Sequence, residues 1–330
     1  MRRGRGGAYM IGGFDIGGTK CAALIGEDKG SDLEIFDRRE FKTEGTPYEV
    51  IAKLISVLKE ELSDKSKTEK DLTAIGVSCG GPLDGKRGII MSPPNLPGWD
   101  NIRITEIIQK ELGVKAYLCN DADASAIAEW KYGAGKGSEN MVFLTFGTGL
   151  GAGLILNGKL YVGANNFAGE AGHIRLDNQG PCGYGKIGSF EGFCSGGGIA
   201  RLAKNRVLEI LQTGEKPDFC ASVSELANIT AKSLFGAAEN GSKLAKDIFA
   251  EVGDYFGLGL SYIIDLLNPE RIIVGGVYMR AHKYIEKSMR ARIKKECLSV
   301  PAKVKVLPAG LGEKIGDYAA LSIAANANNR

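Results

Sequence analysis

Two short glycine-rich turns in the sequence could bind phosphate. They are Gly17-Gly18-Thr19-Lys20, which follows Asp15, and Gly147-Thr148-Gly149. A tight turn of this kind is expected to need positive φ, and a phosphate can approach the backbone closely only where no Cβ stands in the way. The hydroxyls of Thr19 and Thr148 and the ammonium of Lys20 would add hydrogen-bond donors. Each turn alone is equally compatible with an ordinary glycine-containing hairpin.

The second turn repeats the first, because the residues around the two turns match in order. The matching residues are Gly17, Ala22, Leu24 and Ile25 in the first and Gly147, Ala152, Leu154 and Ile155 in the second. Apolar runs at 141–145 and 154–156 flank the second turn, as expected for buried strands. The repeat predicts a duplicated β-hairpin module whose two similar halves face each other across a cleft. Two matching turns favour a polyphosphate ligand over two unrelated hairpins.

Three other phosphate-binding motifs are excluded. Gly147-x-Gly149-x-x-Ala152 fits a relaxed dinucleotide fingerprint, but residues 151–160 indicate strand, turn and strand where that motif opens a helix. The run from Gly153 to Lys159 nearly spells a P-loop, but Leu160 replaces the required Ser or Thr. The H-R-D and D-F-G runs that accompany the glycine-rich loop of protein kinases do not occur in the sequence.

A carboxylate follows a predicted strand at Asn120-Asp121. Residues 114–119 indicate a strand, and the residues from Ala122 onward indicate a helix. Ligands of open α/β sheets bind at such strand ends, which makes Asp121 a candidate for acid–base chemistry. The same position would suit an inert helix N-cap, with Asp123 beside it in the first turn. The local sequence leaves both roles open.

A second polar cluster comprises Glu170, His173 and Glu191. His173 is one of two histidines, and a glycine-rich turn region at 180–188 separates it from Glu191. The stretch has little helical or strand periodicity, which favours a binding site over a structural role. Farther on, Gly275-Gly276 follows a predicted strand and offers bare backbone on which a flat ring could rest.

The remaining chain supplies the elements that would position these residues. An amphipathic helix begins near Pro47, and a buried strand at 74–78 leads into Gly80-Gly81. The loop at 92–100 contains three prolines and Trp99, and it is either a wall for a polar ligand or a plain connector. The other expected strands are 21–26, 33–41, 271–274 and 303–307, and the other expected helices are 196–211, two short ones within 222–238, 243–267, 279–296 and 316–325.

Length and composition narrow the class of protein. The 330 residues suggest two domains, and the composition of 44% hydrophobic and 25% charged residues is typical of a soluble globular protein. A net charge of +3 argues against nucleic acid or a membrane as the main partner. Seven scattered cysteines indicate reduced thiols in a cytoplasmic protein. The basic start, residues 1–7, is expected to be a disordered tail and no secretory signal, and Met10 is a candidate alternative start.

The sequence resembles the ROK (repressor, open reading frame, kinase) family of sugar kinases from about residue 11 to 325. The resemblance rests on Asp15-Ile16-Gly17-Gly18-Thr19-Lys20, Gly80-Gly81-Pro82-Leu83-Asp84, Asn120-Asp121-Ala122, Phe146-Gly147-Thr148-Gly149-Leu150-Gly151 and Gly169-Glu170-Ala171-Gly172-His173, with Pro269 and Gly275-Gly276 in support. It implies an α/β, actin/hexokinase-like (ribonuclease H-like) duplicated fold with two domains around a central cleft. The expected small domain is 1–118, completed by a C-terminal helix at about 311–330, and the large domain is 119–310.

The resemblance also implies roles for single residues. Asp121 matches the general base, which takes the proton from the sugar hydroxyl that attacks the γ-phosphate. The residues that match sugar-binding positions are Gly80, Gly81, Asn95, Asn120, Glu170, His173 and Glu191. Those that match ATP-binding positions are Asp15, Gly17, Gly18, Thr19, Lys20, Gly147, Thr148, Gly149, Gly275 and Gly276. Asp15 would also bind Mg²⁺ through water.

One motif departs from the family pattern. Many members bind structural zinc through a histidine and three cysteines, but here Tyr184 and Ser189 replace two of the cysteines. His173 and Cys182 supply two of the four ligands that zinc prefers. We therefore expect no zinc, with the loop held by hydrogen bonds and packing that include Tyr184.

The resemblance implies an ATP-dependent kinase of a hexose, with Mg²⁺ as cofactor and a homodimer as the assembly. Glucose, phosphorylated at its 6-hydroxyl, is favoured by the glucokinase-like run Pro94-Asn95-Leu96-Pro97-Gly98-Trp99. N-acetylglucosamine, N-acetylmannosamine and fructose are the alternatives. A sugar-sensing protein without catalysis is the alternative from another class. A DNA-binding repressor is disfavoured, because only 14 residues precede Asp15.

Overall fold

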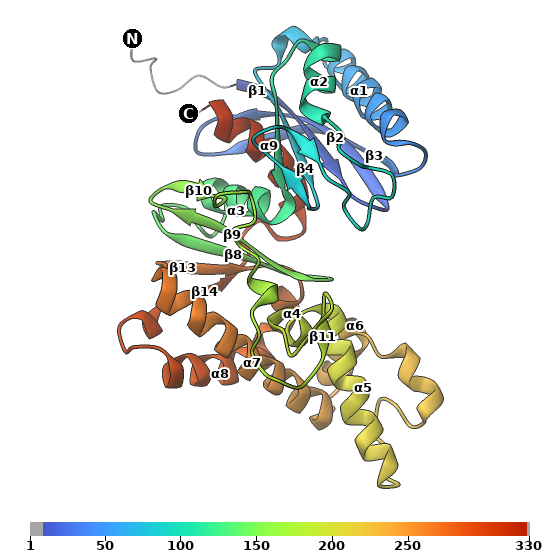
Figure 1. The fold of residues 1–330 in the computed structure, drawn as a ribbon, viewed down its shortest axis with the longest axis vertical. Coiled ribbons are helices and arrows are strands. Elements are labelled where there is room, and N and C mark those ends of the chain that lie inside the picture. The colour runs from blue at the N-terminus through green and yellow to red at the C-terminus, as the bar shows by residue number, and fades with distance from the viewer. Residues whose placement is uncertain (1–8, 329–330) are drawn as a thin grey trace. The chain divides into compact units, whose positions relative to one another are not determined.

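The structure is a computed structural model that describes residues 9–328 (Figure 1). The expected disordered tail at residues 1–7 lies outside the described residues. By packing, the chain forms two compact units. Unit 1 contains the residues up to Glu139, Gly153–Ala168 and the residues from Gly310, and unit 2 contains Asn140–Ala152 and Gly169–Ala309.

The first sheet belongs to unit 1. Its strands are β1 (Tyr9–Ile16), β2 (Lys20–Asp28), β3 (Leu33–Lys42), β4 (Ile75–Cys79) and β7 (Ala116–Asn120), in the order β3-β2-β1-β4-β7. β1, β2 and β3 are antiparallel neighbours, whereas β1, β4 and β7 run parallel. The carboxyl ends of the parallel strands therefore meet at one edge, where Ile16 pairs with Cys79 and Cys79 with Asn120.

Helices cover both faces of this sheet, because alternate residues of each strand point to opposite faces. Phe14, Ala23 and Ile25 belong to the core under α1 (Pro47–Asp64) and α2 (Ile104–Leu112). Ala22 and Leu24 belong to the core under α9 (Ile315–Asn328), which also packs on α3 (Asp121–Tyr132). The short elements of this unit are η1 (Glu69–Asp71), β5 (Leu83–Asp84), β6 (Ile89–Ile90) and η5 (Gly312–Lys314).

α1 starts where the sequence predicts and has a complete capping box. Thr46 accepts a hydrogen bond from the backbone N–H of Glu49, the carboxylate of Glu49 accepts one from the backbone N–H of Thr46, and Pro47 occupies the first turn. The loop at 92–100 is anchored by Leu96 and Trp99, which are buried in the core with α1 and α2. It is therefore fixed to the body of unit 1.

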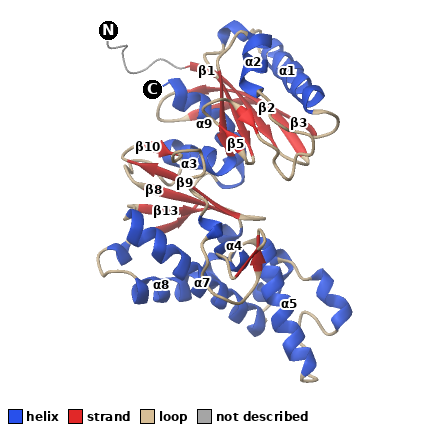
Figure 2. Cartoon of the chain, in the orientation of Figure 1, coloured by secondary structure: helices blue, strands red, loops and turns tan. Residues whose placement is uncertain are grey.

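The second sheet repeats the strand order of the first. Its strands are β8 (Met141–Phe146), β9 (Leu150–Leu156), β10 (Lys159–Tyr161), β13 (Arg271–Val274) and β14 (Lys305–Pro308), in the order β10-β9-β8-β13-β14 (Figure 2). β13 runs parallel to β8 and β14, as β4 does to β1 and β7. This correspondence confirms the duplicated module predicted from the two glycine turns.

The helices of unit 2 pack closely at small residues. A Cβ at Gly253 would lie 2.5 Å from the carbonyl oxygen of Ile285, and one at Gly257 would lie 2.6 Å from that of Met289, so these two glycines of α7 (Lys243–Leu267) let α8 (Val277–Glu296) approach. The other elements of this unit are η2 (Ala171–His173), β11 (Cys182–Gly183), β12 (Lys186–Ile187), α4 (Phe190–Phe193), α5 (Gly196–Gln212), η3 (Val223–Asn228), α6 (Ala231–Glu239) and η4 (Pro301–Lys303).

The packing units differ from the expected domains of 1–118 and 119–310. α3 lies in unit 1 because Ala124 and Ile127 pack against Ala319 and Ile323 of α9. The segment from Gly153 to Ala168 joins it, and Gly153 is part of the reason, since a Cβ there would lie 2.5 Å from the Cβ of Ala126. Among the residues described, no helix combines the length and the apolar character that a membrane span requires.

Candidate active site

The carboxyl edge of the first sheet brings together three of the predicted segments. Because Ile16, Cys79 and Asn120 are consecutive register partners, the residues around them occur side by side at the ends of β1, β4 and β7. A Cβ at Gly81 would lie 3.2 Å from Nδ2 of Asn120, which shows how close the two segments come. This edge is where ligands bind in open α/β sheets.

Asn120, and not Asp121, is the N-cap of α3. Oδ1 of Asn120 accepts a hydrogen bond from the backbone N–H of Ala122 at 2.9 Å, and Asp121 is the first helical residue. The interpretation of Asp121 as a simple N-cap is therefore wrong. Oδ1 of Asp121 shares the same N–H at 2.8 Å. The side chain remains exposed, but protein surrounds it densely enough that burial raises the pKa of its carboxyl, against the lowering effect of that hydrogen bond.

Asp15 lies one residue before the end of β1 in a strongly acidic environment. Burial and the carboxylates of Asp317 and Asp121 raise the pKa of Asp15 to about 6, against the opposing effect of the Arg38 guanidinium. Arg38 in turn donates to Asp317, in the first turn of α9, and to Glu40 of β3. Sequence reasoning missed Asp317, although a carboxylate in the first turn of a predicted helix was visible.

The first glycine turn differs from its prediction. None of its glycines adopts positive φ. The backbone N–H of Gly17 donates to the carbonyl of Lys20, and a Cβ at Gly18 would lie 2.3 Å from the carbonyl oxygen of Asn95. Gly18 thus makes room for the 92–100 loop, which brings Asn95 beside the turn. The ammonium of Lys20 pairs with Glu40, while Thr19 is exposed.

The second glycine turn, between β8 and β9, also lacks positive φ at Gly147 and Gly149. The backbone N–H of Gly147 donates to the carbonyl of Gly149 at 3.0 Å, and that of Gly196 donates to the carbonyl of Gly147 at 2.7 Å. Thr148 is exposed between them. A Cβ at Gly147 would meet no atom within 4 Å, so this glycine leaves open space beside the backbone. The prediction of positive φ at both turns is wrong, because the backbone makes each turn with no glycine of the turn in the left-handed region.

Gly275-Gly276 lies against the second turn. The backbone N–H of Gly275 donates to the carbonyl of Leu144 at 2.9 Å, and Gly276 has a φ of 67°. A Cβ at Gly276 would lie 2.1 Å from the carbonyl oxygen of Phe146 and 3.2 Å from the backbone nitrogen of Gly147. The structure thus brings together the two segments that were predicted separately for the phosphates and the adenosine of ATP.

Glu170, His173 and Glu191 also gather beside the start of β9. A Cβ at Gly172 would lie 3.2 Å from the Cβ of Glu191 and 2.2 Å from the carbonyl oxygen of Leu150, so the segment with Glu170 and His173 packs on both. Glu170 and His173 are exposed. The segment that contains Glu170 and η2 therefore lies beside Glu191 of α4, and the binding role of these residues remains a prediction.

Hydrogen bonds and ring packing hold the loop in which Tyr184 and Ser189 replace cysteines. Ser189 is the N-cap of α4 and accepts a hydrogen bond from the backbone N–H of Gly192 at 3.1 Å. The ring of Tyr184 packs edge-on against His173 with centroids 5.3 Å apart, and Cys182 is an exposed free thiol. Within residues 9–328 there is no group of three or more His, Cys, Asp and Glu side chains that could hold a metal ion. The absence of zinc remains a prediction.

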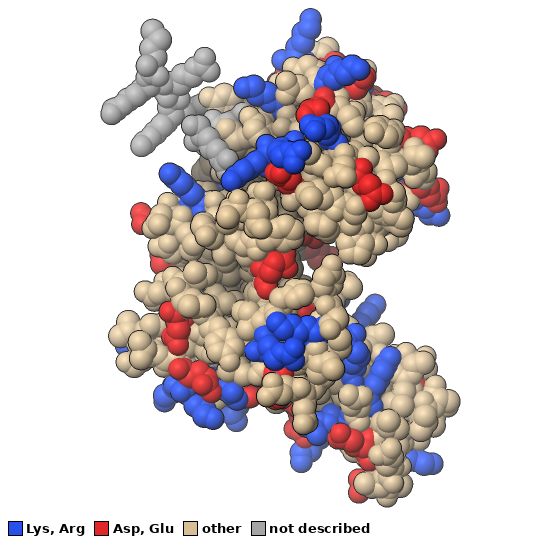
Figure 3. All heavy atoms as spheres, viewed as in Figure 1, with Lys and Arg blue, Asp and Glu red and all other residues tan. Residues whose placement is uncertain are grey.

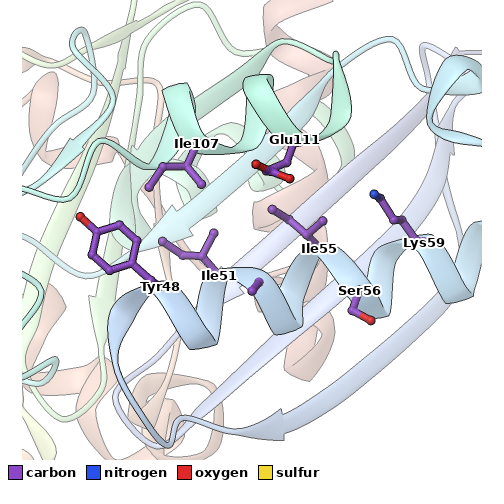
Figure 4. Close-up of a pocket in the computed structure, with 8 residues that line it drawn as sticks. Tyr48, Ile51, Ile55, Ser56, Lys59, Ile107 and Glu111 are labelled. Carbon is purple, nitrogen blue, oxygen red and sulfur yellow. The ribbon is translucent and has the colours of Figure 1, made fainter.

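Two cavities in unit 1 lie outside these clusters. A groove of about 450 Å³ runs between α1 and α2, with Ile51, Ile55 and Ile107 along it and Tyr48 at one end (Figure 4). A second, of about 410 Å³, is lined by the β5–β6 hairpin and residues 164–167. Neither contains a predicted site residue. The face shown in Figure 3 carries both acidic and basic side chains, scattered among a larger area of other residues, and it offers no argument for a nucleic acid partner.

The comparisons with known proteins agree with this geometry. The model of the ROK family matches residues 11–327. A glucokinase of Halalkalibacterium halodurans is 31% identical over 271 residues, which is 82% of this chain and 80% of the glucokinase. A xylose repressor of Bacillus spizizenii is 27% identical over 310 residues, 92% of this chain and 74% of the repressor. The crystal structure of a ROK family glucokinase from Streptomyces griseus, in complex with glucose and AMPPNP, matches with a TM-score of 0.73 and 30% identity over 97% of this chain and 100% of that one.

The strand order, the repeated glycine turns and these matches point to one conclusion. The chain belongs to the ROK family and has the α/β, actin/hexokinase-like fold of its sugar kinases.

Proposed function

We propose that the protein is an ATP-dependent sugar kinase that phosphorylates a hexose, with Asp121 as the general base. The observation that carries the proposal is the placement of Asp121. This residue is exposed at the carboxyl edge of the parallel strands, and the N-cap of α3 is Asn120 and not Asp121. The similarity to glucokinases supports the same assignment. A carboxylate with a raised pKa is a better proton acceptor than an ordinary aspartate.

The proposed mechanism assigns one proton transfer and much positioning. As the sugar hydroxyl attacks the γ-phosphate, its proton passes to a carboxylate oxygen of Asp121. The hydrogen bond from the backbone N–H of Ala122 to Oδ1 orients the carboxylate, and Oδ2 is the oxygen proposed to accept the proton. Phosphoryl transfer passes through a loose transition state, so the larger part of catalysis comes from alignment and charge stabilisation.

Asn120, Glu170, His173 and Glu191 are proposed to bind the sugar, with Gly80, Gly81 and Asn95 beside it. A sugar carries hydroxyls on every side, and carboxylate, amide and imidazole groups are the donors and acceptors that it needs. Glucose, phosphorylated at its 6-hydroxyl, is the proposed substrate because the glucokinase of H. halodurans and the glucose complex of the S. griseus enzyme are among the relatives. N-acetylglucosamine, N-acetylmannosamine and fructose remain the alternatives.

The two glycine turns, residues 17–20 and 147–149, are proposed to bind the phosphates of ATP, and Gly275-Gly276 its adenosine. The open space beside Gly147 suits the close approach of a phosphate, and the exposed hydroxyl of Thr148 would add a donor. The S. griseus enzyme binds the ATP analogue AMPPNP, which supports ATP as the phosphoryl donor.

Asp15 fits a Mg²⁺ ion. Magnesium is held by one or two carboxylates together with waters and substrate phosphates, so it needs no cluster of three protein ligands. Burial is the main cause of the raised pKa of Asp15, and the carboxylates of Asp317 and Asp121 add to it; their negative charge would favour a divalent cation there. A bound Mg²⁺ would neutralise charge on the β- and γ-phosphates.

A regulatory sugar-binding protein is the second candidate, because the xylose repressor matches 92% of this chain. The test is a coupled ADP-release assay with MgATP and the sugars named above, with identification of the phosphorylated product. Turnover that depends on one sugar is the expected result and would also name the substrate. Sugar binding without turnover on any of them would contradict the kinase and favour the regulator. Size-exclusion chromatography with light scattering would test the proposed homodimer.

A further inference from the structure

Glu191 holds the second glycine turn through a direct hydrogen bond. The residue lies in the first turn of α4, and its Oε2 accepts from the backbone N–H of Leu150 at 3.0 Å. Leu150 is the first residue of β9 and follows the turn directly. Within the described part of the chain, Oε2 is the only oxygen of this carboxylate with a hydrogen-bond donor. Oε1 is therefore available for a ligand.

Gly149 is the residue that makes this contact possible. A Cβ at Gly149 would lie 2.6 Å from Oε2 of Glu191, whereas a Cβ at Gly147 would meet nothing within 4 Å. Neither glycine has positive φ, so neither is required by its backbone conformation. The two glycines of the turn thus serve different purposes: Gly147 leaves space outside the protein, and Gly149 leaves space for the carboxylate of Glu191.

The helix that carries Glu191 is itself firmly placed. Phe190 is fully buried and packs against Phe256 with ring centroids 5.8 Å apart, and a Cβ at Gly259 would lie 2.4 Å from its Cζ. Ser189, two residues before Glu191, is the N-cap of this helix. A side chain on such a support can fix a neighbouring turn, because its own position is determined by packing.

We propose that Glu191 is a positioning residue for the nucleotide as well as a contact of the sugar. Oε2 fixes the phosphate turn, and Oε1 accepts a hydrogen bond from a sugar hydroxyl. The identity of the two ligands rests on the proposed function, whereas the contact with Leu150 does not. A sugar bound to Oε1 restricts the rotamer of Glu191 and with it the turn, so nucleotide binding costs less ordering when sugar is present. By linkage, the nucleotide strengthens sugar binding by the same factor.

Two variants separate the hydrogen bond from the charge. Glu191→Gln removes the negative charge beside the turn but keeps an amide oxygen that can accept from Leu150. Glu191→Ala removes both. Glu225→Ala is the matched control, because Glu225 also accepts one backbone N–H in unit 2, that of Ala221 at 2.8 Å, in η3. A Gly149→Ala variant, made alone and together with Glu191→Ala, tests the close contact in a double-mutant cycle.

The first measurement is the affinity for Mg-AMPPNP by calorimetry, with and without saturating glucose. Without sugar, we expect Glu191→Ala to bind about tenfold more weakly than Glu191→Gln, the size of one hydrogen bond to a well-placed acceptor. Glucose is expected to tighten AMPPNP binding in the wild type and to have no such effect in Glu191→Ala. Equal affinities of the Ala and Gln variants would overturn the proposal, since a pure sugar ligand would leave sugar-free nucleotide binding unchanged.

The second measurement, hydrogen–deuterium exchange of peptides over 147–154, requires no ligand. Faster exchange is expected in Glu191→Ala and in Gly149→Ala, but not in Glu225→Ala, and the Gly149→Ala substitution should have little further effect once Glu191 is alanine. If the wild type binds no Mg-AMPPNP, the proposed function fails, and exchange still tests the contact. Unchanged exchange in Glu191→Ala would then overturn the positioning role. If Glu191→Ala does not fold, exchange is compared between Gly149→Ala, Glu191→Gln and the wild type. Equal exchange in all three would overturn the positioning role of Glu191.

Discussion

Replacing Glu61 with glutamine is expected to stabilise the protein, and more strongly as the pH rises. Glu61 lies in α1 with no exposed surface, and neither carboxylate oxygen has a hydrogen bond of good geometry among the described residues. Burial, with a smaller contribution from the Asp37 carboxylate, raises the pKa of Glu61 to about 8, although the guanidinium and the backbone N–H of Arg39 act in the opposite direction. Ionisation of Glu61 in the folded state therefore lowers the stability of the protein.

The direction in which the stability changes with pH follows from proton linkage. Between its usual pKa of 4.5 and about 8, Glu61 keeps its proton in the folded state and loses it in the unfolded state. The unfolded state binds fewer protons in this window, so the free energy of unfolding falls as the pH rises through it. At about 1.4 kcal/mol per pH unit, the loss is roughly 3 kcal/mol at pH 7 and roughly 5 kcal/mol above pH 8. Glutamine has the same shape and does not titrate.

Urea denaturation at pH 5.5, 7.0 and 8.5 would measure the free energy of unfolding of Glu61→Gln, of the wild type and of a Glu60→Gln control. The side chain of Glu60, next to Glu61 in the sequence, is 61% exposed. The advantage of Glu61→Gln over the wild type is expected to grow by about 3 kcal/mol from pH 5.5 to 8.5, whereas Glu60→Gln should stay within about 0.5 kcal/mol of the wild type. A difference that does not change with pH would refute the burial of an ionisable carboxyl at this position.

Three further results are expected. Gly18→Ala places a Cβ 2.3 Å from the carbonyl oxygen of Asn95 and should cost about 1–3 kcal/mol of stability, measured as a fall in Tm. Gly147→Ala is the control and should leave Tm unchanged, because its Cβ would meet nothing within 4 Å. Equal Tm values for the two variants would contradict the packing of the 92–100 loop on the turn. Lys20→Met should raise the KM for ATP about tenfold, and Glu40→Gln, which removes the partner of Lys20, should not raise it; a higher KM in Glu40→Gln would mean that Glu40 supports the lysine. Elemental analysis should find no zinc, and one zinc per chain would show that Tyr184 and Ser189 do not abolish the site.

Local patterns predicted most of the elements because their signals lie within one segment. The spacing of Ile51, Leu54 and Leu58 predicted α1, and the matching turns predicted a duplicated β-hairpin module, which the two sheets of equal strand order contain. α2 was missed although its signal is present, since Ile104, Ile108 and Leu112 recur at helical spacing before Gly113 in the left-handed region. Its start lacks a side-chain cap at Arg103, which removes the usual marker of a helix N-terminus.

The contacts that shape the site could not be predicted, because they join segments far apart in the sequence. Gly18 was interpreted through a phosphate, but its missing side chain accommodates the carbonyl of Asn95. Gly149 was interpreted in the same way, but the carboxylate of Glu191 occupies that space. The local sequence can indicate that a position needs a glycine, but it cannot show which distant residue occupies the space that a side chain would fill. The capping question at Asp121 was open for the same reason, since it depends on the rotamer of Asn120.

The most direct test of the account is the turnover of Asp121→Asn. The substitution should leave α3 intact, because Asn120 is the cap and the new amide oxygen can still accept from Ala122. Asp64→Asn, at the exposed end of α1, is the matched control. We expect kcat with glucose and MgATP to fall by about 10²–10⁴-fold in Asp121→Asn and to stay unchanged in Asp64→Asn, while glucose and Mg-AMPPNP bind both variants as they bind the wild type. A kcat for Asp121→Asn within threefold of the wild type would contradict the role of Asp121 as the base.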